Sequence, residues 1–203
     1  KRISEDTVGV GLAEDLRAWA TEAPSEVLAD ILIGGMNRAE LPIPAAGVVA
    51  PMLGPQDFLL APLPNQIFTR DTTCWIYGGV TLNPMFWPAR RWETLNAAAV
   101  YRFHPDFAGA AQVWYGDPMV DHGAANLEGG DVMPIGNRAV LVGMGERTTP
   151  QAVGQLARAL FAGGEVDRVI ARENPEGQTF SWAYDAVGNL TRQTDADDGN
   201  TYL

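Results

Sequence analysis

The chain has 203 residues, of which 46% are hydrophobic and 19% are charged, and its net charge is −11 at neutral pH. This is the composition of a globular chain of about one domain with a small appendage, and it excludes collagen, coiled-coil and disordered classes. The acidic balance argues against a nucleic-acid partner, and a single cysteine excludes both an internal disulfide and a zinc site of the CxxC type. No apolar run approaches the roughly 20 residues that span a bilayer, so we expect no membrane partner.

Residues 5–36 predict a short helical hairpin. Two apolar stripes recur at helical spacing, and Pro24 and the glycine pair at 34–35 mark where the second helix begins and ends. The stripes consist of Leu12, Leu16 and Trp19 in the first helix, and of Val27, Leu28, Ile31 and Leu32 in the second. The segment 41–64 is apolar and rich in proline, with strand candidates at 48–49 and 58–60.

The segment 65–171 contains a weak internal repeat of architecture. Each of two units reads as strand, glycine turn, strand, helix, strand, which is a ββαβ module. The first predicts strands at 74–77, 80–82 and 112–115 around a helix at 91–103; the second predicts strands at 131–135, 139–143 and 166–170 around a helix at 150–162. The second helix is well marked, because Thr149 can cap it and Pro150 suits its first position. The chain is therefore expected to be α/β.

In both units an acid precedes an arginine by 19 residues: Asp71 with Arg90, and Glu128 with Arg147. Placed side by side, the modules would surround one pocket with two carboxylates and two guanidinium groups. Carboxylates recognise guanidinium or ammonium groups, and arginines bind carboxylates in a planar, bidentate manner. Such a pocket suits a zwitterion like arginine. The alternative is that each acid and arginine form a structural salt bridge.

Three further residues could in principle act as a nucleophile or a metal ligand, but their sequence context favours a structural role. Cys74 lies among bulky strand residues and is interpreted as a buried structural thiol. His104 follows a predicted helix and suits a cation at its C-terminal end. His122 has several acids nearby, but their spacing matches no metal site, and a solvated acidic loop is the better interpretation; we expect no metal and no cofactor.

The composition changes near residue 172. Residues 173–203 are acidic and rich in Gly, Asn, Thr and Asp, with no helical period. We therefore divide the chain into a helical segment (1–40), a segment of two modules (41–171) and a β tail (172–203).

Several stretches resemble arginine deiminases. Residues 65–71 resemble the N-x-x-F-T-R-D motif of that family, the stretch 75–91 continues the similarity, and residues 128–131 and 146–148 resemble its E-G-G-D and E-R-T motifs. The resemblance covers roughly residues 5–171. It implies a pentein α/β-propeller, of which this chain would hold about two ββαβ modules together with part of a helical insertion.

The family reaction is hydrolysis of L-arginine to L-citrulline and ammonia, a step of arginine catabolism, through a cysteine nucleophile and a histidine that shuttles protons. The resemblance implies that Asp71 holds the substrate guanidinium and that Glu128 orients the catalytic histidine. Arg90 and Arg147 would clamp the substrate carboxylate. Asn65 and Phe68 would line the pocket. L-arginine is the expected ligand, no cofactor is implied, and a cytoplasmic enzyme is expected.

The resemblance stops where the family's His-x-Asp motif should follow the strand that ends near Ala171. The nucleophilic cysteine belongs near the family's C-terminus, and Cys74 is not at its position. We therefore expect a truncated, catalytically deficient chain that holds half of a pocket. Open strand edges predict self-association or a complementary segment.

The tail has a resemblance of its own. Residues 184–195 resemble one YD repeat of the RHS type, a β-hairpin unit of shells around secreted toxins. The alternatives to a deiminase-like enzyme are thus a non-catalytic arginine-binding module and an RHS-toxin-associated chimeric fragment.

Overall fold

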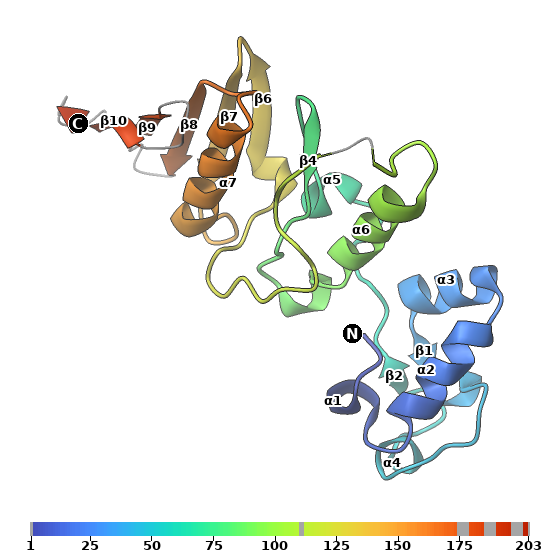
Figure 1. Ribbon diagram of the computed structural model, residues 1–203. Coiled ribbons are helices and arrows are strands. Elements are labelled where there is room, and N and C mark those ends of the chain that lie inside the picture. The colour runs from blue at the N-terminus through green and yellow to red at the C-terminus, as the bar shows by residue number, and fades with distance from the viewer. Residues whose placement is uncertain (1, 110–111, 174–178, 185–189, 196–200, 203) are drawn as a thin grey trace. The chain divides into compact units, whose positions relative to one another are not determined.

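A computed structural model describes residues 2–109, 112–173, 179–184, 190–195 and 201–202. The chain forms two compact units, residues 1–66 and 67–203 (Figure 1). The division into 1–40, 41–171 and 172–203 that the sequence suggests stays a prediction. In the part of the chain that is described, no helix is both long and apolar enough to cross a bilayer.

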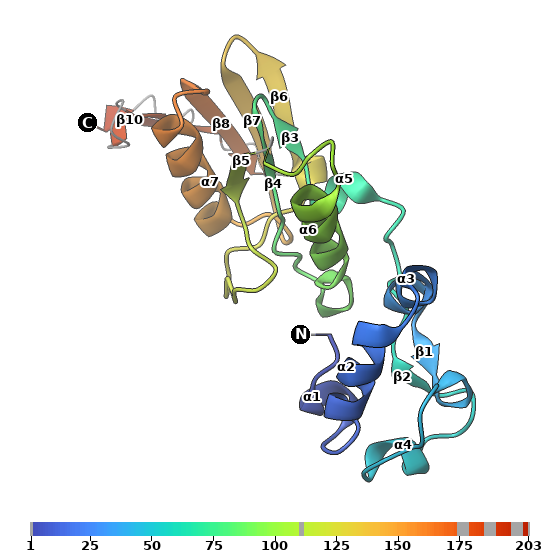
Figure 2. The ribbon, with the colours of Figure 1, turned by 45° about the vertical axis from the view of Figure 1, so that its right-hand side comes forward.

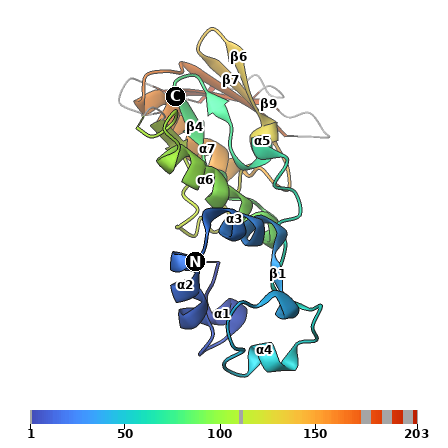
Figure 3. The same cartoon turned by 90° about the vertical axis from the view of Figure 1, so that its right-hand side faces the viewer.

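The first unit is mostly helical, with one small sheet. Its elements are α1 (Glu5–Val8), α2 (Ala13–Glu22), α3 (Ser25–Gly34), β1 (Met36–Asn37), the 3-10 helix η1 (Arg38–Glu40), α4 (Val49–Met52) and β2 (Phe58–Leu60). Strands β1 and β2 pair antiparallel, and α3 and α4 lie at opposite ends of the unit (Figure 3). The core of this unit consists of Val8, Leu12, Ala13, Leu16, Met36, Ala50, Leu59 and Leu60.

The predicted helical hairpin is confirmed. Leu12 and Leu16 are buried and Trp19 packs against the same core, so the first apolar stripe faces inward as expected. The second stripe, on α3, is only partly covered: Ile31 packs on the core, but no residue of this helix is fully buried.

The strand expected at 58–60 is present, but the one expected at 48–49 is wrong. Val49 begins α4 instead, and Val48 has a helical backbone. Gly47 has a φ of +75°, so the chain turns directly before this segment. Pro51 lies in the first turn of α4, where its missing N–H costs nothing, whereas in a strand it would remove a ladder hydrogen bond.

The second unit contains the two predicted ββαβ modules. The first consists of β3 (Trp75–Ile76), β4 (Gly79–Thr81), α6 (Glu93–Phe103) and β5 (Gln112–Tyr115), preceded by the single helical turn α5 (Thr69–Thr72). The 3-10 helix η2 (Pro88–Arg90) leads into α6. Strand β4 pairs antiparallel with β3 and parallel with β5, and α6 makes the crossover between the two parallel strands.

The second module repeats this order. After the 3-10 helix η3 (Gly129–Asp131) come β6 (Val132–Gly136), β7 (Ala139–Met144), α7 (Pro150–Ala162) and β8 (Arg168–Glu173). Strand β7 pairs antiparallel with β6 and parallel with β8, and α7 lies along one face of this sheet (Figure 2). The expected α/β class and the two-module architecture are therefore confirmed.

Helix α7 forms for the reasons that the sequence indicates. The Thr149 hydroxyl accepts a hydrogen bond from the Ala152 amide at the N-terminus, and Pro150 occupies the first position. Its apolar face is buried in the core of the unit: Ala152, Val153, Leu156, Ala157, Leu160 and Phe161.

Three further strands extend the second sheet: β9 (Thr179–Tyr184), β10 (Leu190–Asp195) and β11 (Thr201–Tyr202). All three join antiparallel, and the strand order is β11-β10-β9-β8-β7-β6. The β tail predicted from the sequence thus continues the sheet of the second module. The connecting residues 185–189 of the predicted YD repeat lie outside the described residues.

The two modules meet at Gly129, where only a glycine fits. A Cβ atom there would overlap the carbonyl oxygen of Arg70 and would lie 2.9 Å from Asn83 Nδ2 and 3.0 Å from Cys74 Cβ. All three neighbours belong to the first module. The E-G-G-D segment thus sits directly on the segment that carries Asp71.

We expect Gly129→Ala to lower the free energy of unfolding by about 1–3 kcal/mol, because the new methyl group must displace backbone of the first module. Urea denaturation measures this loss. The matched control is Gly154→Ala on the exposed side of α7, where a Cβ meets nothing within 4 Å. That change should stabilise the chain by about 0.5–1 kcal/mol through helix propensity. Equal effects of the two substitutions would contradict the close contact at Gly129.

Candidate functional site

The first carboxylate of the site is Asp71, which lies in the single helical turn α5. Buried Asn83 holds this turn: its side-chain Nδ2 donates to the Asp71 carbonyl oxygen at 2.8 Å, and its backbone N–H donates to the Thr72 carbonyl oxygen at 2.9 Å. Thr94 in turn donates its hydroxyl hydrogen to the Asn83 carbonyl oxygen at 2.7 Å. Helix α6 therefore fixes the turn that presents Asp71.

Arg90 bridges two carboxylates of the first module. Its Nη1 lies 2.9 Å from Asp71 Oδ2, and its Nε donates to Glu93 Oε2 at 3.0 Å. Its Nη2 lies 2.9 Å from the same Glu93 oxygen as an ion-pair contact without hydrogen-bond alignment. The side chains of Arg90 and Glu93 are 7% and 0% exposed, so this pair is a buried, fixed group.

The second module supplies Glu128 and Arg147. Arg147 Nη1 lies 2.8 Å from Glu128 Oε2, and the exposed fractions of the two side chains are 49% and 4%. The Thr148 hydroxyl accepts from the Glu128 backbone N–H at 3.1 Å and donates to Asp131 Oδ2 at 2.6 Å. One threonine therefore ties the two acids of the E-G-G-D segment to the loop that carries Arg147.

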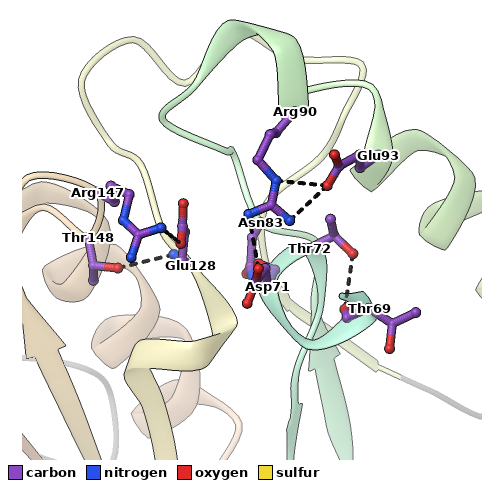
Figure 4. Close-up of polar contacts among 9 residues, drawn as sticks. All are labelled: Thr69, Asp71, Thr72, Asn83, Arg90, Glu93, Glu128, Arg147 and Thr148. Carbon is purple, nitrogen blue, oxygen red and sulfur yellow. Dashed lines mark hydrogen bonds and ion pairs between the residues drawn. The ribbon is translucent and has the colours of Figure 1, made fainter. Parts of the chain in front are cut away.

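The ion pairs of the two modules, Asp71–Arg90–Glu93 and Glu128–Arg147, lie beside one another (Figure 4). Burial raises the pKa of the Glu128 carboxyl, and the guanidinium groups of Arg147 and Arg90 oppose this shift without cancelling it. Asp71 and Asp131 raise that pKa further by like-charge repulsion. Burial alone would lower the pKa of Arg90, but its hydrogen bonds to Glu93 and Asp71 outweigh burial and raise it.

The arrangement is suited to a cation. The two ion-paired groups contain three carboxylates (Asp71, Glu93 and Glu128) and two guanidinium groups, so negative charge is in excess. The charge of a fourth acid, Asp131, also reaches Glu128. Glu128 Oε1 is fully buried and has no hydrogen-bond partner among the described residues. A buried, unpartnered carboxylate oxygen is costly, and an N–H donor would relieve that cost. Within the described ranges, no group of three or more His, Cys, Asp and Glu side chains could hold a metal ion.

The structure brings together the four residues that the repeated spacing singled out. Each acid forms an ion pair with the arginine of its own module, as the salt-bridge alternative predicted. The implied roles in ligand binding stay predictions. Sequence reasoning missed Glu93, Asn83 and Thr148, which hold the charged groups in place. For Glu93 a signal existed, because it follows Arg90 by three residues at the start of a predicted helix.

The two residues expected to line the pocket belong to different units. Asn65 is half-buried and lies near the end of the first unit. Phe68 lies in the second unit, directly before α5, and its side chain is 58% exposed. Their place in a pocket stays a prediction.

Cys74 is a buried thiol, as expected. Burial raises its pKa, although the hydrogen bond with the Thr81 hydroxyl and the charge of Arg70 act in the opposite direction. His104 is exposed at the C-terminal end of α6. His122 is half-buried against the ring of Tyr115, and its Nε2 accepts from the Asp117 N–H at 3.1 Å.

Comparison with known families identifies the relationship. A family model described as "Arginine deiminase" matches residues 1–181. The chain belongs to the arginine deiminase family. A second model, "RHS Repeat", matches residues 165–200 of this deiminase-family chain, so the two matches overlap on β8 and β9.

Among solved structures, the chain is similar to three structures of dimethylarginine dimethylaminohydrolase. An adduct with 4-chloro-2-hydroxymethylpyridine is 20% identical with a TM-score of 0.43, covering 58% of this chain and 44% of that one. A histidine-to-glycine variant with S-methyl-L-thiocitrulline is 22% identical with a TM-score of 0.43 and the same coverage. A cysteine-to-serine variant from Pseudomonas aeruginosa with citrulline is 20% identical with a TM-score of 0.44, covering 58% and 42%. The chain spans less than half the length of each.

The raised pKa of Glu128 predicts a pH-dependent stability. The folded chain holds the Glu128 proton more tightly than the unfolded chain between the two pKa values, so the stability contributed by this group falls as the pH rises through that window. Glu128→Gln does not titrate. Relative to the parent chain, its free energy of unfolding should therefore be higher at pH 7 than at about pH 4, below the ordinary glutamate pKa.

Urea denaturation at the two pH values measures that difference, and Glu26→Gln on the exposed surface of α3 reports the loss of one negative charge alone. A Glu128→Gln chain that is less stable, relative to the parent, at pH 7 than at pH 4 would show that the Arg147 ion pair outweighs burial.

The burial of Cys74 predicts a slow thiol. We expect a disulfide reagent such as DTNB to label the native chain at least about 100-fold more slowly than the urea-unfolded chain, because the thiolate is the reactive form and burial disfavours it. Absorbance at 412 nm follows the released thiolate. Labelling of the native chain at the unfolded rate would mean that Cys74 is accessible and available for chemistry.

Proposed function

We propose that the deiminase-family chain recognises guanidino compounds that carry a carboxylate, with L-arginine as the ligand, at the cluster around Asp71 and Glu128. The observation that carries this proposal is the buried, unpartnered Glu128 Oε1 beside a second carboxylate. Carboxylate oxygens only accept hydrogen bonds, and a guanidinium has five N–H donors in a plane. The acidic excess of the site therefore matches the cationic end of arginine.

The other end of the ligand is assigned to the arginines. Arg147 is half-exposed and can reach a ligand carboxylate, with which a guanidinium forms two parallel hydrogen bonds. Arg90 is buried and engaged with two acids, so its contribution is to keep Asp71 in place and to add positive charge. A ligand without a carboxylate, such as agmatine, should gain less from this site than L-arginine.

We further propose that the 203-residue chain by itself does not hydrolyse L-arginine. The family reaction needs a thiolate that attacks the guanidinium carbon. The chain's single cysteine is buried, its pKa is raised, and its Sγ lies 3.2 Å from the Thr81 hydroxyl. A thiol in that state has neither the charge nor the access that a nucleophile requires. The role proposed for Glu128 in the family reaction is to orient the histidine that shuttles protons.

The RHS-associated alternative has one observation in its favour. Strand β9 pairs with β8 of the second module, with Val169 opposite Trp182 and Arg172 opposite Thr179. The segment that matches the RHS repeat is thus hydrogen-bonded to the deiminase module as part of one sheet. In this second proposal, the second deiminase module supplies the strand edge to which the RHS-like strands are added.

Isothermal titration of the 203-residue chain tests the binding proposal. L-arginine should bind more tightly than agmatine, and Asp71→Asn should weaken L-arginine binding at least about tenfold, since the negative charge opposite the ligand guanidinium is lost. Asp167→Asn is the matched control, because Asp167 also pairs with an arginine, Arg138, but on the exposed surface at 2.7 Å. In the same samples, citrulline should not form above the Asp71→Asn background.

Two results would contradict these proposals separately. If the parent and Asp71→Asn chains bound L-arginine with equal affinity, the proposed binding site would be wrong. Citrulline formation that depends on Asp71 would keep the site but would show that the chain is a complete catalyst.

A further inference from the structure

The two carboxylates that are proposed to bind the ligand, Asp71 and Glu128, are each paired with a guanidinium group of the chain itself. Asp71 Oδ2 contacts Arg90 and Glu128 Oε2 contacts Arg147, at 2.9 and 2.8 Å. A ligand guanidinium offers the same donors to the same acceptors. The chain's own arginines are therefore competitors for the cationic end of any guanidino ligand.

The two internal guanidinium groups differ in how firmly they are held. Arg90 is 7% exposed and forms a second ion pair with Glu93, which is fully buried. Displacing Arg90 from the site would leave the fully buried Glu93 carboxylate without its cation, which is costly. Arg147 has only Glu128 as an ion-pair partner among the described residues, and its side chain is 49% exposed. Water can therefore solvate the Arg147 guanidinium itself when it leaves Glu128.

Glu128 sets the condition for that exchange. Its side chain is 4% exposed, and Oε1 already has no hydrogen-bond partner in the part of the chain that the structure describes. If Arg147 left without a replacement, both oxygens of a buried carboxylate would be unpaired. Departure of Arg147 is favourable only when another cation arrives at Glu128.

We propose that Arg147 is a displaceable internal guanidinium: the guanidinium of the ligand replaces it at Glu128, and the released Arg147 binds the ligand carboxylate. Arg90 stays in place, locked by Glu93. This inference rests on the proposed function and assigns specificity to the exchange. A ligand with only a cationic end displaces Arg147 and gives it no new anion. A ligand with both ends displaces Arg147 and pairs it again.

The key variant is Arg147→Gln, which removes the competitor and the carboxylate clamp together. Agmatine and methylguanidine should bind the variant at least about twofold more tightly than the parent chain, because Arg147 no longer competes for the buried Glu128 carboxylate. The preference for L-arginine over agmatine should fall at the same time. A residue that only clamps a carboxylate would leave agmatine affinity unchanged. A residue that only supports the fold would lower the affinity for all ligands.

Two matched variants separate charge from structure. Arg147→Lys keeps a cation at Glu128, so agmatine affinity should stay within about twofold of the parent. Arg138→Gln removes an arginine from an exposed ion pair with Asp167 elsewhere in the same unit, and it should change no affinity.

NMR of the arginine side chains in the parent chain supplies a readout that does not depend on any variant. On saturation with methylguanidine, the Nε–H signal of Arg147 should move toward the position of solvated arginine, whereas that of Arg90 should keep its slow hydrogen exchange. Assignment follows from the Arg147→Gln spectrum, in which one signal is missing.

The outcomes distinguish this inference from the proposed function. If L-arginine binds the parent chain in an Asp71-dependent manner but Arg147→Gln binds agmatine no more tightly, the exchange is overturned and the site remains. An unchanged Arg147 signal at saturation has the same meaning. If neither the parent nor the Arg147→Gln chain binds any of the three compounds, both are overturned. If agmatine or methylguanidine binds only the Arg147→Gln chain, Arg147 blocks Glu128 in the parent chain, as the inference predicts.

Discussion

The Arg90 guanidinium, held between Asp71 and Glu93, is the interaction on which the first module depends. It joins the turn α5 to the start of α6, and Asn83 and Thr94 reinforce the same connection. A buried cation between two carboxylates is stable only while both remain in contact with it. The position of Asp71 therefore depends on helix α6, through Glu93 and Thr94.

The second module has the same sequence spacing but a different degree of burial. Here the acid is buried and the arginine is half-exposed, whereas in the first module the arginine is buried between two acids. The difference arises from Glu93, for which the second module has proline at the equivalent offset, Pro150. Among the described residues, Arg147 therefore has a single ion-pair partner, whereas Arg90 has two. For this reason Arg90 is held in place and Arg147 is the arginine that a ligand can displace.

The contact at Gly129 brings these two charged groups together. Because its missing side chain lets the E-G-G-D segment lie against Arg70, Asn83 and Cys74, Glu128 comes near enough to Asp71 and Arg90 for their charges to affect its pKa. Burial lowers the effective dielectric constant, so charges affect one another more strongly here than at a surface. The arginine deiminase family match, which extends to residue 181, includes this whole arrangement.

The sequence by itself determined the α/β class, the two ββαβ modules, the cap of α7 and the family, because these depend on local periodicity and on motif letters. It also singled out Asp71, Arg90, Glu128 and Arg147, since their spacing repeats. It failed at Val48, where a glycine turn and a proline override β propensity. Only the tertiary structure decided that each acid pairs with its own arginine, that Glu93 holds one pair in place, and that a Glu128 oxygen has no partner among the residues that the structure describes. Ion pairing and burial depend on which side chains meet in space, and spacing along a chain does not fix that.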